Sequence, residues 1–405
     1  MGEIIREADM ATPLTCEKLL DFDLVESIEK KLPPETQYRF FRVSYEIMNM
    51  DSFIRDLPSF PGSTDKIIRN ELISVIGATL SIEGTVIDKD EIEEGIKKAS
   101  QGEPLRRKER EADNSRKVYK FIQEVIAKNK SNFEYSESII KQIHTYFTED
   151  LDYVSNTPGR YRTNFNVTFG HPRKSSLCQT QSDIEFAMKG LITWLNRKND
   201  SIDLSDNPFV KAIMAHYYLT EIHPFADGNG RTARALEALI LLANGVNDYC
   251  FWSLANFWSS HKDNYIDKLH KIRETLDPID FIIWGLEGYR DEIKTTKEKV
   301  LKKVKQLMFS DYIQFLFKNK KEQKIKLNHR IIEVIKIIIS KERISIKKFL
   351  SVPEISAFYY KTSQSTRLRD MQKMIRYNLI KTVKDGNDEF IEPNYSILDR
   401  VRYNV

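Results

Sequence analysis

Apolar residues recur at three- and four-residue spacing along most of the chain, which is the pattern of helices that bury one face. The spacing is clearest in seven segments, residues 38–49, 66–82, 117–128, 137–147, 183–195, 208–222 and 232–243. Prolines and glycines punctuate the pattern, as expected of loops, at Pro34, Pro58, Pro61, Gly84, Pro104, Pro158 and Gly159. The pattern predicts a mainly α-helical protein.

Two segments depart from this pattern and are typical of β hairpins. Residues 160–170 alternate aromatic or β-branched residues with polar ones and end at Gly170. Residues 379–395 contain two strand-like runs joined by Asp385, Gly386, Asn387 and Asp388, a combination that favours a tight turn.

The last part of the chain predicts a small separate domain, residues 327–405. Apolar spacing favours helices at 329–340, 345–350 and 363–378, and the second hairpin follows them. A lysine-rich stretch at 294–326 precedes this domain, and we interpret it as a solvated helical linker. Upstream, we expect an N-terminal helical region over 1–110 and a main helical core over 111–293.

Composition is that of a soluble globular protein, with 405 residues, 41% hydrophobic and 30% charged. The net charge of +4 is too small to indicate nucleic-acid binding by itself. The three cysteines lie far apart, which is typical of reduced thiols (Cys16, Cys178 and Cys250). The N-terminus lacks the features of a secretory signal, and no apolar run is long enough to cross a bilayer. We therefore expect a cytoplasmic protein with no membrane partner.

The segment richest in chemistry is 223–234, HPFADGNGRTAR, which lies between two apolar helices. A glycine-bearing loop that opens a helix directs unpaired backbone N–H groups toward an anion. Gly228 and Gly230 allow a phosphate to approach the backbone closely, because they have no Cβ. Arg231 and Arg234 add charge-assisted donors on the first helical turns.

Two further residues of this segment suit transfer of a phosphorus group. Asp227 is the type of oxygen ligand that holds Mg²⁺ beside phosphates. His223 ionises near neutral pH and can accept a proton from an attacking hydroxyl. A DGNG run alone is more often a simple turn, whereas the whole segment supplies a base, a metal ligand and an anion site together. His216 is spaced to share a metal with His223, but no third ligand has suitable spacing, and a packed His216 is favoured.

The segment resembles the signature of the Fic family, H-P-F-x-[D/E]-G-N-[G/K]-R-x-x-R, at every defined position, and the resemblance extends over residues 39–286. It implies a helical bundle with a β-hairpin flap, and transfer of AMP from ATP to a Tyr, Ser or Thr hydroxyl of a target protein or of the chain itself. It assigns His223 as the base and Asp227 as the Mg²⁺ ligand. It assigns ATP to a set of residues that includes the loop anchor Phe225, the anion-hole residues Gly228, Asn229 and Gly230, and the phosphate-binding residues Arg231 and Arg234.

A second motif, Thr79-Leu80-Ser81-Ile82-Glu83-Gly84, resembles the inhibitory motif of the family, [S/T]-x-x-x-E-[G/N]. By this resemblance, Glu83 pairs with Arg234 and displaces the γ-phosphate. The same Glu83 is compatible with the reverse reaction, removal of AMP. The alternative is an ordinary helix end with a solvent-facing Glu83.

Three further assignments follow from the resemblance. The hairpin 160–170 corresponds to the flap that docks the target by strand addition, with Arg162, Thr163 and Val167 in flap positions, or it is an ordinary surface hairpin. Tyr265 corresponds to an adenine-pocket residue or is simply part of the core. The tail resembles a winged helix-turn-helix domain, whose basic third helix suits DNA or a partner protein about equally.

Two other functions remain open from the sequence. The chain is alternatively a DNA-binding transcription regulator that uses the Fic core as a nucleotide sensor. The same loop also suits transfer of another phosphate-containing group, such as UMP or phosphocholine. The sequence leaves the oligomeric state open, and the resemblance is compatible with a homodimer.

Overall fold

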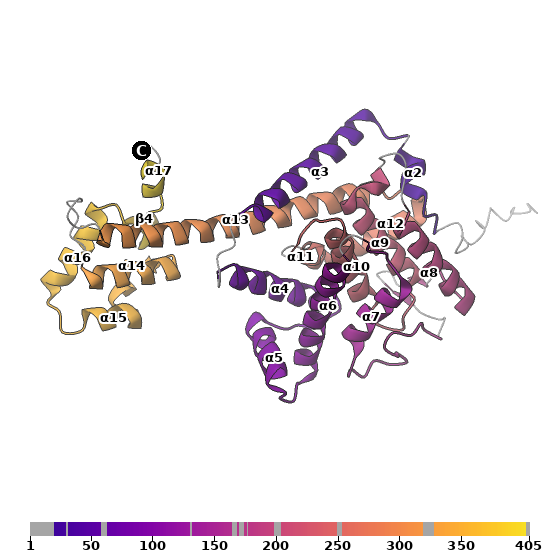
Figure 1. Cartoon of the computed structure of the whole chain (residues 1–405), viewed down its shortest axis with the longest axis horizontal. Coiled ribbons are helices and arrows are strands. Elements are labelled where there is room, and N and C mark those ends of the chain that lie inside the picture. Colours follow the sequence, from indigo (N-terminus) through magenta and orange to yellow (C-terminus); the bar gives the residue numbers. More distant parts are fainter. Residues whose placement is uncertain are drawn as a thin grey trace, which may run out of the picture. The chain divides into compact units, whose positions relative to one another are not determined.

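The computed structural model describes residues 20–29, 31–57, 63–129, 132–163, 168–169, 174–175, 177–197, 204–248, 253–318 and 328–401. The protein is mainly helical, as predicted (Figure 1). It divides into two compact units, residues 1–297 and 298–405, and each unit has its own hydrophobic core. Among the described residues, no helix is both long enough and apolar enough to span a membrane.

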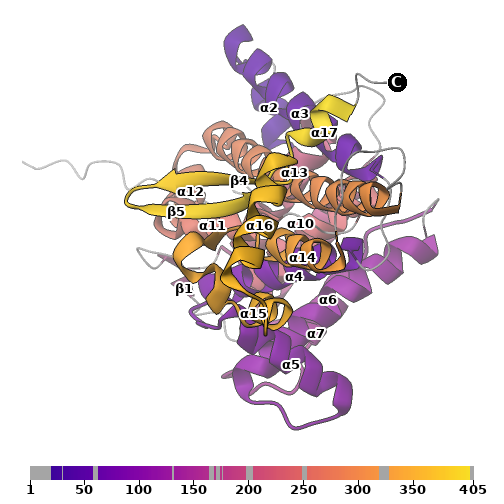
Figure 2. The same cartoon turned by 90° about the vertical axis from the view of Figure 1, so that its left-hand side faces the viewer.

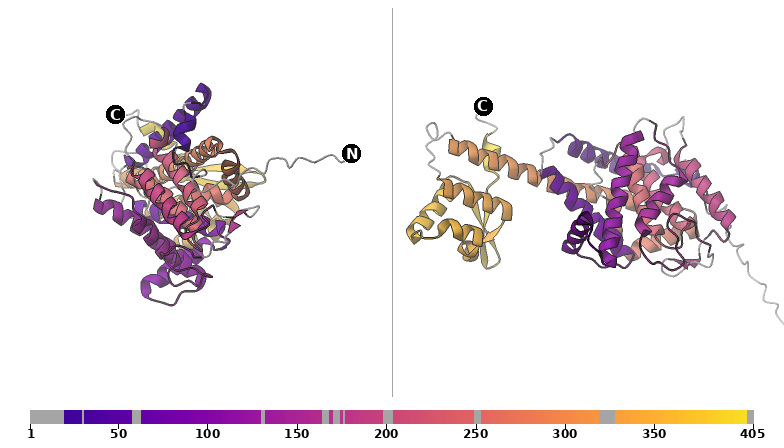
Figure 3. Two further views of the ribbon diagram at one scale, coloured as in Figure 1. Left: turned by 90° about the vertical axis from the view of Figure 1, so that its right-hand side faces the viewer. Right: turned by 60° about the horizontal axis from the view of Figure 1, so that its bottom comes forward.

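The centre of the first unit is formed by α9 (Pro208–Ile222) and α10 (Asn229–Ala243), which pack against each other (Figure 1). Figure 3 shows the helices of the chain from two further sides. Every residue of α9 except Pro208 and Lys211 is buried. A helix that is apolar on all sides is stable only when other helices cover it. The other helices of the unit supply this cover and share one core with the central pair.

The predicted helices of the first unit are present, most of them with longer bounds. They are α3 (Pro34–Arg55), α4 (Ser63–Ile82), α6 (Arg107–Asn129), α7 (Glu137–Thr148), α8 (Gln181–Leu195), α9 and α10. The pattern does not identify α2 (Leu24–Glu29), α5 (Lys89–Gln101) and α11 (Leu254–Ser260), or the full extent of α12 (Lys262–Thr275) and α13 (Ile279–Lys318). A short 3₁₀ helix, η1, spans Leu204–Asp206.

The predicted domain boundaries need correction. A boundary between residues 110 and 111 would fall inside α6, where the flanking Glu109 and Glu111 are buried. The boundary predicted between residues 293 and 294 lies close to the division at 297/298, and both positions fall inside α13. The lysine-rich stretch is also more than a solvated linker, because Phe309, Ile313 and Leu316 belong to the core of the second unit.

The predicted hairpin at 160–170 is displaced along the chain. The paired strands are β1 (Thr168–Phe169) and β2 (Lys174–Ser175), which run antiparallel. Residues 160–163 form no strand, because this segment bonds to the loop after α9 instead, and the Arg162 N–H donates to the Pro224 carbonyl at 2.9 Å.

The second unit contains α14 (His329–Lys341), β3 (Ile344–Ser345), the 3₁₀ helix η2 (Ile346–Ser351), α15 (Pro353–Tyr359), α16 (Gln364–Arg376), β4 (Ile380–Asp385), β5 (Asp388–Pro393) and α17 (Ile397–Val401). The order of strands in its sheet is β3-β5-β4. Figure 2 shows the hairpin formed by β4 and β5. The hairpin predicted at 379–395 is confirmed. The helix predicted at 345–350 is present as the 3₁₀ helix η2, and the next α-helix, α15, which was not predicted, starts at Pro353.

Candidate active site

Two residues in left-handed conformations shape the loop between α9 and α10. His223 ends α9 with φ of 49°, and Gly228 precedes α10 with φ of 79°. This conformation is common for glycine at a helix end and uncommon for histidine. The turn at His223 therefore ends α9 and begins the loop that leads to α10.

Side chains within the loop fix its backbone. The Asn229 amide donates to the Phe225 carbonyl at 2.8 Å and accepts from the Phe225 N–H at 2.9 Å. The Thr232 hydroxyl donates to the Gly228 carbonyl at 2.9 Å. Asn229 was assigned to the anion hole by resemblance, but its side chain is buried and braces the loop from inside. Any anion contact from Asn229 must therefore come from its backbone.

His144 on α7 packs against the loop and is a site residue that no sequence motif identifies. Its ring stacks on Phe225, with 3.8 Å between ring centres. Its Nδ1 accepts from the Gly159 N–H at 2.9 Å, so Nε2 carries the proton and donates to the Asp227 carbonyl at 2.9 Å. Burial lowers the pKa of His144 to about 4, which keeps the ring neutral.

The same stacking fixes the side chain of Phe225, which the resemblance places among the ATP-binding residues. The side chain is fully buried against His144 and Tyr161. It anchors the loop in the core, as the motif suggests, and does not face a ligand.

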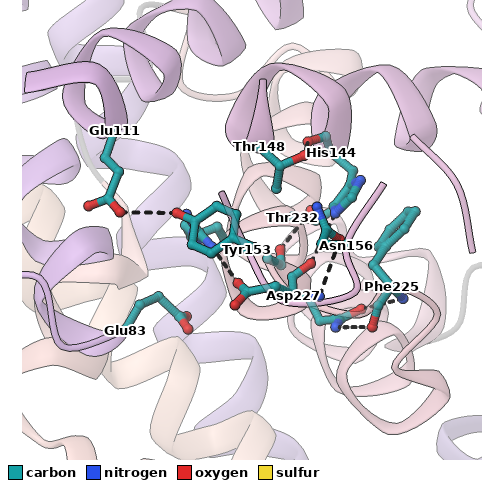
Figure 4. Close-up of polar contacts among 12 residues, drawn as sticks. Glu83, Glu111, His144, Thr148, Tyr153, Asn156, Phe225, Asp227 and Thr232 are labelled. Carbon is teal, nitrogen blue, oxygen red and sulfur yellow. Dashed lines mark hydrogen bonds and ion pairs between the residues drawn. The ribbon is translucent and has the colours of Figure 1, made fainter. Parts of the chain in front are cut away.

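A chain of polar contacts leads away from Asp227 (Figure 4). Arg231 donates from Nη2 to Asp227 Oδ1 at 2.6 Å and from Nη1 to the Tyr153 hydroxyl at 2.5 Å. The Tyr153 hydroxyl donates to Glu111 Oε1 at 3.1 Å. Arg231 is 3% exposed, whereas the Asp227 side chain is 41% exposed. The Asp227 carboxylate is therefore accessible at the mouth of the site, and Tyr153 and Glu111, neither predicted from the sequence, hold the arginine that pairs with it.

His223 is half-buried, and its Nδ1 lies 3.3 Å from the Thr220 carbonyl. That contact places the ring proton on Nδ1 and the basic lone pair on Nε2. Burial lowers the pKa of His223 to about 4, with a partial opposing effect from the bond to Thr220, so the ring is neutral near pH 7. A neutral imidazole is the protonation state that a general base needs.

Arg162 lies beneath His223 and is fully buried. Its Nε donates to the His223 carbonyl at 2.6 Å, and its Nη2 donates to the Cys178 carbonyl at 2.7 Å. The prediction of Arg162 on an exposed flap is therefore wrong, because its guanidinium fixes the backbone of the site. Thr163 is exposed, and Val167 lies outside the described residues.

Glu83 meets Arg234, although the two residues are far apart in the sequence. Arg234 Nη2 donates to Glu83 Oε1 at 2.6 Å and to the Thr79 carbonyl at 3.2 Å, while Nε donates to the Thr79 hydroxyl at 2.6 Å. Gly84 ends this segment in a left-handed turn with φ of 91°, as predicted. Burial alone would raise the pKa of Glu83, but the charges of Arg234 and Arg231 outweigh it and lower the pKa, so the carboxylate is ionised.

The Glu83 carboxylate also lies against the first turn of α10. A Cβ placed on Gly230 would come within 2.5 Å of Glu83 Oε1, so a side chain at this position would displace the carboxylate. The N-terminus of a helix presents unpaired N–H groups and favours negative charge. This site therefore holds an anionic group, at present one from the protein itself.

Tyr265 on α12 is 5% exposed, and its hydroxyl lies 2.6 Å from His216 Nε2. His216 is packed as predicted, with its Nδ1 2.5 Å from Glu237 Oε1. No cluster of three or more metal-ligating side chains is present among the described residues, so a shared histidine metal site finds no support there.

Comparison with known proteins bears on this geometry, since residues 134–241 match the model of the Fic/DOC family. The matched range includes α9 and the loop that leads to α10. Protein adenylyltransferase fic-1 of Caenorhabditis elegans is 47% identical over 58 residues, which is 14% of this chain and 11% of that protein. Protein adenylyltransferase Fic of Aedes aegypti is 30% identical over 146 residues, 36% of this chain and 26% of that protein. The chain thus covers only a minor part of either relative.

Solved structures agree on the fold. A Fic family protein from Desulfovibrio desulfuricans G20 has a TM-score of 0.54 and 16% identity, covering 89% of this chain and 96% of that one. Fic-1 (residues 134–508) from C. elegans has a TM-score of 0.52 and 18% identity, covering 71% of this chain and 89% of that one. α4, which carries Thr79, and the following Glu83 lie outside the range that matches the family model. The contact between Glu83 and Arg234 is therefore seen in this structure and does not come from that match.

Proposed function

We propose that this protein transfers AMP from ATP to a Tyr, Ser or Thr hydroxyl of a target protein or of itself. The observation that supports this most directly is a neutral imidazole, His223, next to a helix N-terminus that already holds an anionic group. Arg231 and Arg234 flank this position, and both are buried by the protein. A polyphosphate fits such a site because backbone N–H groups and guanidinium groups both bind phosphate oxygens.

In the proposed reaction, a target hydroxyl oxygen attacks the α-phosphorus of ATP. The bond from this phosphorus to the oxygen that bridges to the β-phosphate breaks, and pyrophosphate leaves. His223 takes the hydroxyl proton on Nε2, since its Nδ1 proton faces the Thr220 carbonyl. The left-handed backbone at His223, fixed by Arg162, holds the ring in the orientation that this proton transfer needs.

Mg²⁺ fits beside Asp227, whose carboxylate is accessible, although no group of three or more metal-ligating side chains is present among the described residues. Magnesium sites with nucleotides commonly use one or two carboxylates, with phosphate oxygens and water as the other ligands. When bound, the ion would neutralise charge on the phosphates. Asp227 would have to exchange its bond to Arg231 for the ion, which frees Arg231 for a phosphate oxygen.

The Glu83–Arg234 pair is proposed as a brake on this reaction. Arg234 is the residue expected to bind the γ-phosphate, and its Nη2 is occupied by the Glu83 carboxylate. ATP must displace this carboxylate or bind without the contact, which would leave its α-phosphorus misaligned for attack. Loss of the Glu83 carboxylate should therefore raise the rate.

The proposal is tested with ATP labelled at either the α- or the γ-phosphate, in Mg²⁺ buffer, with wild type, Glu83→Gly and His223→Ala. Adenylyl transfer predicts α-label on protein, more of it with Glu83→Gly and none with His223→Ala. Incorporation of γ-label would indicate phosphoryl transfer and contradict the proposal. α-Labelled UTP in parallel identifies a different nucleotide preference.

A second candidate function concerns the C-terminal unit. The order of α14, α15, α16 and the β4–β5 hairpin supports a winged helix-turn-helix, and α16 exposes Arg369, Gln372 and Arg376 on one face. Such a face suits the major groove of DNA. Fluorescence anisotropy with duplex DNA should show binding that weakens with salt and with Arg369→Ala. Binding absent at low salt would contradict the candidate and favour a protein partner.

A further inference from the structure

Arg234 has a second route of charge compensation in addition to Glu83. Its side chain is 1% exposed, and a buried guanidinium is costly unless ionised or polar groups surround it. On one side it meets Thr79 and Glu83. It also lies close enough to the Tyr265 hydroxyl to affect the pKa of that group, which burial raises and the Arg234 charge partly lowers. The hydroxyl therefore stays protonated.

The Tyr265 hydroxyl is linked through His216 to the buried carboxylate of Glu237. The Tyr265 hydroxyl lies 2.6 Å from His216 Nε2 and, because it stays protonated, can donate to that nitrogen. His216 Nδ1 then carries a proton and donates to Glu237 Oε1 at 2.5 Å. The Trp258 N–H donates to the same carboxylate oxygen at 3.2 Å. With Glu237 as the final acceptor, the hydrogen bonds run from Tyr265 through His216 to Glu237, and the Tyr265 oxygen keeps a lone pair for a donor such as the Arg234 guanidinium.

The residues of this chain come from three helices and are all shielded from solvent. His216 lies on α9, Glu237 on α10 and Tyr265 on α12, with exposures of 0%, 2% and 5%. Hydrogen bonds polarise one another in a buried chain and resist rearrangement. Glu83, by contrast, is one-third exposed and approaches from outside this core.

We propose that the chain Tyr265–His216–Glu237 holds Arg234 in its phosphate-binding orientation after Glu83 has left. The inference rests on the proposed function, because it assigns Arg234 to the γ-phosphate. Glu83 is the removable partner of Arg234 and Glu237 is the permanent one. Tyr265 is then a positioning residue for Arg234.

The test measures nucleotide affinity and does not depend on turnover. Binding of Mg-ATP and Mg-ADP is measured by calorimetry in a Glu83→Gly, His223→Ala background, with and without Tyr265→Phe. Loss of the hydroxyl should weaken ATP about tenfold and ADP less than about twofold, because only ATP has the γ-phosphate that Arg234 binds. Tyr217→Phe is the matched control, since the Tyr217 hydroxyl on α9 is buried and has no hydrogen-bond partner among the described residues.

Three results would overturn the inference. These are an unchanged ATP preference, an equal loss for both nucleotides, and a similar effect of the control variant. If the Tyr265 variant does not fold, Glu237→Gln, which keeps an oxygen acceptor for His216 but removes the charge, must lower the ATP preference instead. Absence of any ATP binding in the background variant would contradict the proposed function itself, whereas binding without the expected preference contradicts only this inference.

Discussion

Replacement of Glu83 by glutamine isolates the charge of the proposed brake. The substitution keeps the length of the side chain and an oxygen that can accept from Arg234 Nη2, now 2.6 Å from the carboxylate. What is lost is the negative charge against a guanidinium that is 1% exposed. The Thr79 contacts to Arg234 do not change.

The magnitude follows from the surroundings of the pair. Hydrogen bonds to charged groups contribute about 1.5–3 kcal/mol, and fully exposed ion pairs contribute about 0–1 kcal/mol. Glu83 is 33% exposed and Arg234 is buried, so the charge of Glu83 should contribute an intermediate free energy of about 1–2 kcal/mol to the closed site. A shift of this size corresponds to a change of about 5- to 30-fold in the fraction of sites open to ATP.

The assay is the initial rate of α-label incorporation at an ATP concentration below saturation. Glu83→Gln should label about 5- to 30-fold faster than wild type, and Glu83→Gly at least as fast. Glu124→Gln is the control, because Glu124 is an exposed residue of α6 whose ion pair lies with Lys120. If Glu83→Gln binds ATP but labels no faster than wild type, the carboxylate is not the brake and the reasoning fails.

Three further predictions concern the groups that hold the structure. His144→Leu leaves the Gly159 N–H and the Asp227 carbonyl without partners, which should lower the free energy of unfolding by about 2–4 kcal/mol in urea titrations; a loss below about 1 kcal/mol would contradict a bracing role. The pKa of His144 is about 4 in the folded protein and about 6.5 in the unfolded chain, so the unfolded chain binds this proton first as the pH falls. The free energy of unfolding should therefore fall by up to about 1.4 kcal/mol per pH unit from pH 6.5 down to pH 4. His144→Gln should make this pH dependence shallower than in wild type. In the second unit, Arg330 Nη2 contacts the buried Asp370 at 2.7 Å, so Asp370→Asn should cost about 1–2 kcal/mol in that unit's thermal transition without a change in nucleotide binding.

Local patterns were sufficient for most of the fold. The helices of the central pair were predictable because the spacing of apolar residues follows the positions that are buried. The hairpin β4–β5 was predictable from its turn residues. The omission of α5 was avoidable, since Asp88 and Glu91 form a capping box and Gly102 ends the helix. The second helix of the tail could likewise have been placed by Pro353, which occupies its first turn.

What the patterns could not supply depends on contacts between distant segments. The alternation of polar and apolar residues around Arg162 predicts a hairpin position. Its guanidinium instead donates hydrogen bonds to the His223 and Cys178 carbonyls and is buried. His144 has no distinctive spacing, and its role follows from stacking on Phe225, 81 positions further along the chain. Tyr265 fits an adenine pocket by motif, yet its hydroxyl is engaged by His216. For the site itself, the motif identified His223, Asp227 and the two arginines, because these lie in one continuous segment.

The central claim is that the loop before α10 binds a triphosphate while His223 faces the α-phosphorus. It is tested most directly by a crystal structure of Glu83→Gly with Mg²⁺ and a non-hydrolysable ATP analogue. The γ-phosphate is predicted on Arg234, the metal on Asp227, and His223 Nε2 facing a space that admits a hydroxyl. A loop without nucleotide at saturating analogue, or a nucleotide whose α-phosphate lies away from His223, would contradict the account.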